Sequence, residues 1–126
     1  MRSFIVASLV AAATAAVHKI NVGQGGLTFT PDSVTAEIDD IVEFHFVGGT
    51  HDAGTPGNTN VFHVVVNSTE PHFYYCSVGM HCANGMVAVI NPSEDQTIAA
   101  YKAASQGKPA TAPNAVYGGE FGEPLP

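Results

Sequence analysis

A short loop between two β-prone segments is the feature that most constrains how this chain can fold. The segment before the loop, His72-Phe-Tyr-Tyr-Cys-Ser77, is rich in aromatic residues, and the segment after it, Met86-Val-Ala-Val-Ile90, is apolar. Both compositions are typical of β-strands. Cys76 lies near the end of the first segment, His81 lies in the loop, and Met86 begins the second segment. A fold that pairs these strands brings a thiol, an imidazole and a thioether to one end of a sheet.

The spacing of these three side chains indicates a metal site. Four residues separate Cys76 from His81, and four more separate His81 from Met86. One thiolate, two imidazoles and a weak axial thioether are the ligands of mononuclear copper sites that transfer electrons. Zinc fits less well, because a thioether is a poor ligand for a closed zinc site. The sequence therefore predicts a copper site that needs one more histidine.

His51 is the preferred candidate for the second imidazole. It lies in a Gly-rich stretch just after a predicted strand, where a strand end could meet the loop that contains His81. His63 stays open as an alternative, although its period-two spacing with Val61 and Val65 favours a histidine on a sheet face. The remaining histidines are expected at the surface: His18, His45 and His72.

The rest of the chain predicts an all-β sandwich or barrel. Short segments with strand character are separated by turns rich in Gly, Pro, Asn and Asp. In the segment from residue 41 to 47, Val42, Phe44 and Phe46 share one face, as in a strand with one buried side. The predicted strands cover residues 18–22, 27–30, 34–38, 41–47, 61–66, 72–77 and 86–90.

The two ends of the chain differ in pattern from this core. Residues 1–16 predict a secretory signal peptide, with Arg2, an apolar run and a small-residue cleavage motif. A β-domain is expected over residues 17–92. The capping-box pattern Ser93-Glu-Asp-Gln96 predicts a helix over residues 93–107. Residues 108–126 are rich in Pro, Gly and Ala, so we expect an extended or flexible tail.

Charge and location narrow the possible partners. The 126-residue chain has eleven acidic and four basic residues, and a net charge of −7 excludes an ordinary nucleic-acid-binding surface. A secreted chain without a further apolar run is expected outside the cell, with the cell wall as one option, and not spanning the membrane. Asn67-Ser-Thr69 is an N-glycosylation sequon. We expect a monomer with an unidentified redox partner.

Several motifs resemble the extracellular cupredoxins of fungi, which are related to the plant phytocyanins and to plastocyanin. They are Gly25-Gly-Leu-Thr-Phe-Thr-Pro31, Val42-Glu-Phe-His-Phe46, Phe73-Tyr-Tyr-Cys76, His81-Cys-Ala-Asn-Gly-Met-Val87 and Ile90-Asn-Pro92. The resemblance implies a Greek-key β-barrel and one-electron transfer at a mononuclear type 1 (blue) copper. It also implies that His51, Cys76, His81 and Met86 are the copper ligands.

Cys82 sets up a competing hypothesis. In the family that the chain resembles, the corresponding cysteine usually pairs with another one, and this chain contains only Cys76 and Cys82. A Cys76–Cys82 disulfide would remove the copper thiolate and leave a copper-free cupredoxin-like module of the cell wall or surface. The segment after His51 is also shorter than the family pattern, and Asp52 replaces a common Ser. We do not expect an enzyme, since no residue is evident that would orient Cys76 and His81 as nucleophile and base.

Overall fold

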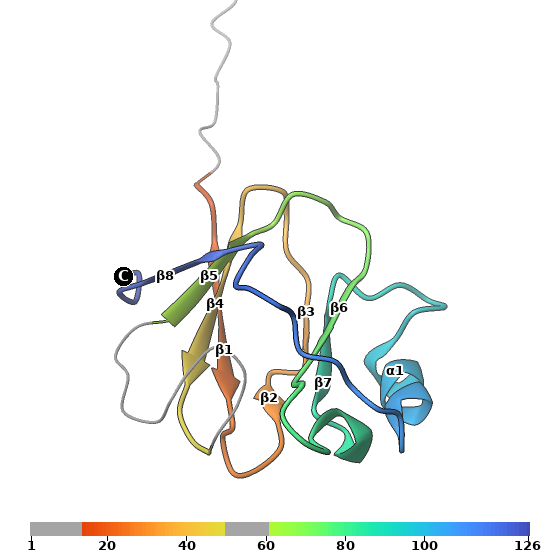
Figure 1. Cartoon of the computed structure of the whole chain (residues 1–126). Coiled ribbons are helices and arrows are strands. Elements are labelled where there is room, and N and C mark those ends of the chain that lie inside the picture. Colours follow the sequence, from red (N-terminus) through yellow and green to blue (C-terminus); the bar gives the residue numbers. More distant parts are fainter. Residues whose placement is uncertain (1–13, 50–60) are drawn as a thin grey trace, which may run out of the picture.

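A computed structural model of the chain describes residues 14–49 and 61–126. Over these residues the chain forms eight strands in two sheets, with one α-helix and one 3-10 helix (Figure 1). Most of the predicted signal peptide lies outside the described residues, and so does His51. The two facing sheets confirm the predicted all-β, cupredoxin-like sandwich with one helix near its C-terminal end.

The larger sheet has five strands in the order β2-β1-β4-β5-β8. At its centre β1 and β4 run parallel, with Ile20 opposite Phe44, whereas the other pairs are antiparallel. The strands are β1 (Val17–Val22), β2 (Phe29–Thr30), β4 (Ile41–Phe46), β5 (Val61–Val65) and β8 (Glu120–Gly122). The first four lie within or close to the predicted segments, and β8 was not predicted.

The smaller sheet has three strands in the order β3-β7-β6. It consists of β3 (Ser33–Val34), β6 (His72–Tyr75) and β7 (Val87–Ile90). All four residues of β7 are buried, as expected for an apolar strand between two neighbours. Because β6 and β7 pair antiparallel, with Tyr75 opposite Val87, they present the loop between them at one end of the sandwich.

The core fills the space between the two sheets. Val42 and Phe44 point inward, as their alternation predicts, and they pack with Ile20 and Ile90. The rings of Phe29, Phe44 and Tyr74 make edge-to-face contacts, with centroids 5.0–6.5 Å apart. Burial of this apolar surface is the main force that holds the sheets together.

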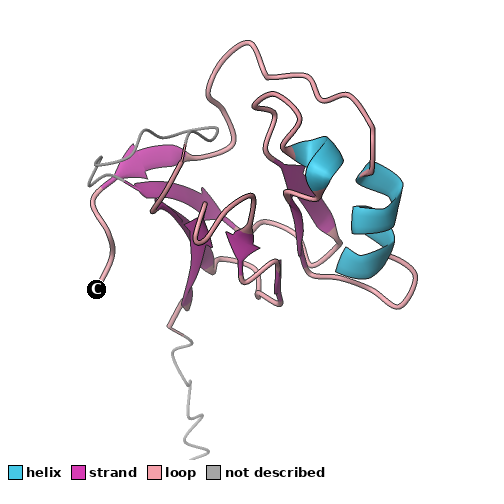
Figure 2. Ribbon diagram, turned by 90° about the horizontal axis from the view of Figure 1, so that it is seen from below, coloured by secondary structure: helices cyan, strands magenta, loops and turns pink. Residues whose placement is uncertain are grey.

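The α-helix begins later than the sequence predicts. Helix α1 covers Ile98–Ser105, and the Thr97 side chain accepts a hydrogen bond from the backbone N–H of Ala100. The Ser93 hydroxyl instead accepts a hydrogen bond from the N–H of Gln96 within a preceding turn. The ring of Tyr101 packs 4.9 Å from that of Phe73, which holds the helix against the smaller sheet. Figure 2 shows both helices beside this sheet.

After the helix the chain returns to the larger sheet. The Tyr75 hydroxyl donates a hydrogen bond to the carbonyl of Thr111, and β8 then pairs with β5. The rings of Phe62 and Phe121 lie 5.1 Å apart across this pair. In Figure 2 the C-terminus therefore lies at the larger sheet, on the far side from α1. Neither helix in the described part of the chain could span a membrane.

Candidate metal centre

Cys76 and Met86 face each other at the mouth of the loop between β6 and β7. The N–H of Cys76 donates a hydrogen bond to the carbonyl of Met86, which extends the strand pairing by one step beyond Tyr75 and Val87. Both side chains belong to the core cluster, with 1% of Cys76 and 0% of Met86 exposed. The hairpin thus places a thiol and a thioether in an apolar environment that excludes water.

Backbone hydrogen bonds hold the rest of the loop in shape. The N–H of His81 donates to the carbonyl of Val78, and the carbonyl of His81 accepts from the N–H of Met86. The 3-10 helix η1 (Cys82–Asn84) fills the space between them. Gly85 ends η1 in the left-handed region, with a φ of 98°, and its N–H donates to the carbonyl of Cys82. A glycine is favoured there because this backbone conformation strains residues with a Cβ atom.

The loop brings the thiol and the imidazole together. The Sγ atom of Cys76 lies 3.3 Å from Nδ1 of His81. Of the two ring nitrogens of His81, Nδ1 is therefore the one that faces the sulfur. A thiolate and an imidazole nitrogen this close, with a thioether on the adjacent strand, fit the soft and borderline donor set of a blue-copper site. Three of the four predicted ligands therefore belong to one ordered hairpin.

The fourth predicted ligand, His51, lies outside the described residues. The ends of β4 and β5 that flank the segment containing His51 nevertheless lie close to Cys76. Phe46, at the end of β4, and Phe62, near the start of β5, line the same apolar pocket of about 250 Å³ as Cys76. In Figure 1 the end of β4 and η1 lie at the same end of the sandwich. Within residues 14–49 and 61–126, no group of three or more His, Cys, Asp or Glu is placed to hold a metal ion.

No disulfide joins Cys76 to Cys82 in the structure. Cys82 lies in η1 with 7% of its surface exposed, beyond the end of β6. Burial, and then the charge of the nearby Cys76, raise the pKa of the Cys82 thiol. The bond required by the copper-free hypothesis is thus not observed.

Separate from this hairpin, a cluster of polar side chains lies on the outer face of the larger sheet. Glu43 is 0% exposed, and its two carboxylate oxygens lie 2.5 Å from Nε2 of His45 and 2.9 Å from Nε2 of His63. The backbone N–H of Leu125 donates a third hydrogen bond to this carboxylate, at 2.8 Å. Burial acts to raise the pKa of Glu43, but the hydrogen bonds from Leu125, His63 and His45 outweigh it and lower the pKa.

This cluster corrects the expectation for His45 and shows the position of His63. His45, expected at the surface, is partly buried, with 23% of its side chain exposed. His63 lies between Phe62 and Val64, which pack on the core, so its side chain is on the opposite face from Cys76. His63 is therefore a sheet-face histidine that bonds Glu43. Glu43 and His45 lie two positions apart and so share one strand face, which indicates this cluster in the sequence. No feature of the sequence indicates the contact with Leu125.

The chain has clear relatives among known proteins. No protein-family model matches it. Over 141 aligned positions it is 38% identical to "Probable GPI-anchored cupredoxin-1" of Arthroderma benhamiae, and the alignment covers 96% of this chain and 75% of that protein. The chain belongs to the cupredoxin family. The cupredoxin is also 35% identical to "Extracellular serine-rich protein" of the same organism, over 91% of its own length and 55% of that relative. It therefore spans about half of this second relative.

The alignments also show that the relatives are longer than this chain within the aligned region. The alignments extend over 141 positions, whereas this cupredoxin has 126 residues, so the relatives contain residues in the aligned region that have no counterpart here. This agrees with a chain that is shorter than the family pattern.

Proposed function

We propose that this cupredoxin binds a single copper ion through His51, Cys76, His81 and Met86 and carries one electron at a time outside the cell. The observation that carries the proposal is the 3.3 Å approach of Cys76 Sγ to His81 Nδ1 at a hairpin mouth that also holds Met86. Bound copper would supply the one-electron couple between Cu(II) and Cu(I). The chain itself supplies the ligands and their fixed surroundings.

The residues around the site suit this role. The sulfur of Cys76 lies in the core, where few water molecules can compete for the metal or solvate a change in its charge. The hydrogen bonds from His81 to Val78 and from Met86 to His81 fix the loop. A site whose ligands move little between two oxidation states needs little reorganisation for each transfer. We propose no catalytic role, and the redox partner is not identified.

The location is part of the same proposal. The predicted signal peptide and the names of the two relatives, one GPI-anchored and one extracellular, favour a place outside the cell or at its surface. Asn67 is exposed just after β5, so the sequon is accessible to glycosylation. We propose a monomeric glycoprotein.

Metal stoichiometry and electrochemistry test the proposal. Native mass spectrometry of the mature protein with added copper is expected to show one copper per chain, and voltammetry a reversible one-electron wave. Cys76→Ser, His81→Ala and His51→Ala are expected to lose this tight binding. Cys82→Ser and His72→Ala, which change a cysteine and an exposed histidine outside the ligand set, are expected to keep it. Equal copper binding by Cys76→Ser and the unsubstituted protein would overturn the proposal.

A further inference from the structure

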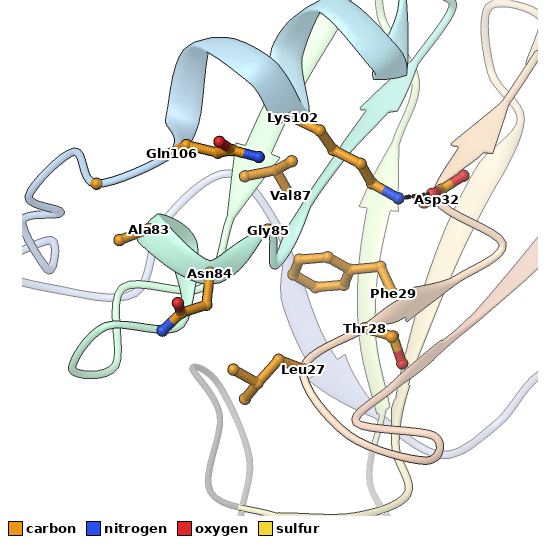
Figure 3. A pocket seen from close by; sticks show the side chains of 11 residues that line it. Leu27, Thr28, Phe29, Asp32, Ala83, Asn84, Gly85, Val87, Lys102 and Gln106 are labelled. Carbon is orange, nitrogen blue, oxygen red and sulfur yellow. Dashed lines mark hydrogen bonds and ion pairs between the residues drawn. The ribbon is translucent and has the colours of Figure 1, made fainter.

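A second pocket, on the flank of the sandwich, is not used by the proposed electron transfer. It has a volume of about 650 Å³ and lies between the loop before β2, the turn after η1 and the end of helix α1 (Figure 3). This size falls within the range of small-molecule sites in proteins. The N–H of Gly107 donates a hydrogen bond to the carbonyl of Ala83, which fixes the helix end against η1. The walls of the pocket are thus held in place without a ligand.

The lining of this flank pocket is mixed, with more polar than apolar surface. Phe29 and Val87 form a buried apolar floor, and Leu27 is 37% exposed beside them. Figure 3 shows Leu27 and Phe29 entering from the side opposite Ala83 and Asn84. The polar groups stand around this floor. They are the hydroxyl of Thr28, the carboxamides of Asn84 and Gln106, and the charged groups of Asp32 and Lys102.

The charged groups of the pocket neutralise each other. Nζ of Lys102 lies 2.5 Å from Oδ2 of Asp32, and within residues 14–49 and 61–126 these are the only charged side chains that line the pocket. In Figure 3 Lys102 reaches from α1 across one rim to Asp32. A charged ligand would gain no net attraction from this balanced pair, and it would have to disrupt the pair to use either partner. The electrostatics therefore favour a neutral ligand.

Two carboxamides among the lining residues keep hydrogen-bonding capacity. Asn84 uses one N–H of its side chain to donate to the carbonyl of Met80, so its Oδ1 and second N–H remain. The exposed side chain of Gln106 has no hydrogen-bond partner within the described part of the chain. Each carboxamide can both donate and accept, which is the capacity that a hydroxyl group requires.

We infer that this pocket binds a neutral hexose unit of a polysaccharide or glycan. A pyranose ring has apolar C–H faces, which can pack on Leu27 and on the accessible edge of Phe29. Its rim of hydroxyl groups matches the donors and acceptors of Asn84, Gln106 and the Asp32–Lys102 pair. Such a site would attach the protein to carbohydrate, a role separate from the proposed electron transfer.

The direct test is a nuclear magnetic resonance titration of the copper-free mature chain with short oligomers of glucose, mannose and N-acetylglucosamine. Binding of at least one oligomer is expected to give saturable amide shifts at Leu27–Phe29, Asn84, Gly85 and Gln106. The series shows which neutral hexose the pocket prefers. Absence of saturable shifts with all three at millimolar concentration would overturn the inference, and so would shifts confined to another surface.

Substitutions locate the binding and test its charge preference. Asn84→Ala and Gln106→Ala are each expected to weaken binding about three- to tenfold, the loss of one or two hydrogen bonds. Gln96→Ala, an exposed glutamine before the same helix and outside this pocket, is the matched control. Lys102→Met leaves Asp32 without its cation, so this variant is expected to gain affinity for glucosamine oligomers, which are cationic.

The spectra of the free variants check that each is folded. Unchanged affinity in both Asn84→Ala and Gln106→Ala would contradict the inference. A preference of the unsubstituted protein for glucosamine or glucuronate oligomers over neutral ones would contradict it as well.

Discussion

Oε2 of Glu43 lies 2.9 Å from Nε2 of His63, across the pairing of β4 with β5 and on the outer face of the larger sheet. The carboxylate is 0% exposed although it faces away from the core, because the chain near Leu125 passes over it. A buried carboxylate is stable only when its oxygens are hydrogen-bonded. Here His45, His63 and the backbone N–H of Leu125 provide those bonds.

Removal of the Glu43 carboxylate is expected to destabilise the fold. Glu43→Ala leaves two imidazoles and one backbone N–H without their acceptor, so we expect a loss of about 2–4 kcal/mol in the free energy of unfolding. Urea denaturation with an unchanged m-value measures this loss. Glu94→Ala, at an exposed position, is the control and is expected to stay within about 0.5 kcal/mol of the unsubstituted protein. A similarly small effect for Glu43→Ala would show that the cluster contributes little.

The lowered pKa of Asp40 predicts a specific loss of folding stability in acid. Hydrogen bonds from His18 and then from the backbone N–H groups of Ala16 and Glu37 lower the pKa of Asp40 from 3.8 to about 2. Ala16 is the last residue of the predicted signal peptide, but the His18 bond, which is the largest cause, lies within the predicted domain. A carboxylate whose pKa is lower in the folded than in the unfolded state stabilises the fold above its unfolded pKa. That contribution is lost as the pH falls through the folded value. The contribution of Asp40 is therefore fully present above about pH 4 and disappears toward pH 2.

Asp40→Asn isolates this contribution. The difference in unfolding free energy between the unsubstituted protein and Asp40→Asn is expected to shrink as the pH falls from 4 to 2. Chemical denaturation at a series of pH values measures it. Asp95→Asn, at an exposed position before α1, should show no such change in its difference from the unsubstituted protein. A constant difference for Asp40→Asn over this range would mean that Asp40 is not the titrating group.

Gly119 determines whether β8 can dock. A Cβ atom at this position would lie 2.3 Å from the carbonyl oxygen of His63 and 2.7 Å from Cζ of Phe62. A contact with backbone this short cannot be relieved without moving the strand. Gly119→Ala is therefore expected to release β8 and to cost about 1–3 kcal/mol. Hydrogen exchange should become faster at the backbone amides that pair β5 with β8, but not at those that pair β1 with β4.

The control for this prediction is Ala115→Ser, at an exposed position in the same stretch of chain. It is expected to leave the exchange rates of β5 unchanged. Equal protection of β5 in Gly119→Ala would show that the strand accommodates the extra atom.

The sequence predicted those features that depend on neighbouring residues. The alternation of Val42 and Phe44 placed β4 and its buried face correctly, because strand side chains alternate by geometry. Cys76 and Met86 meet because the hairpin that joins them is short, so the spacing alone brings them together. His51 stays a prediction, since it lies outside the described residues.

Features that depend on distant parts of the chain were not predictable in the same way. From the sequence, Glu43 is expected to be a polar residue on an exposed strand face. Its burial follows from the contact with Leu125, which is 82 positions away. Nothing local marks Glu120–Gly122 as a strand, because β8 forms by adding to the edge of β5. Ser93 and Thr97 can both cap a helix, and their side chains alone do not decide which one does.

The proposed copper site requires that the Cys76 thiolate binds copper beside His81. The most direct measurement is the visible absorption spectrum, with electron paramagnetic resonance, of the mature protein loaded with Cu(II). We expect a strong thiolate-to-copper band and a narrow copper hyperfine splitting. Both should be absent in Cys76→Ser and retained in Cys82→Ser. A colourless Cu(II)-treated protein, with an internal Cys76–Cys82 disulfide found by mass spectrometry after alkylation, would contradict it.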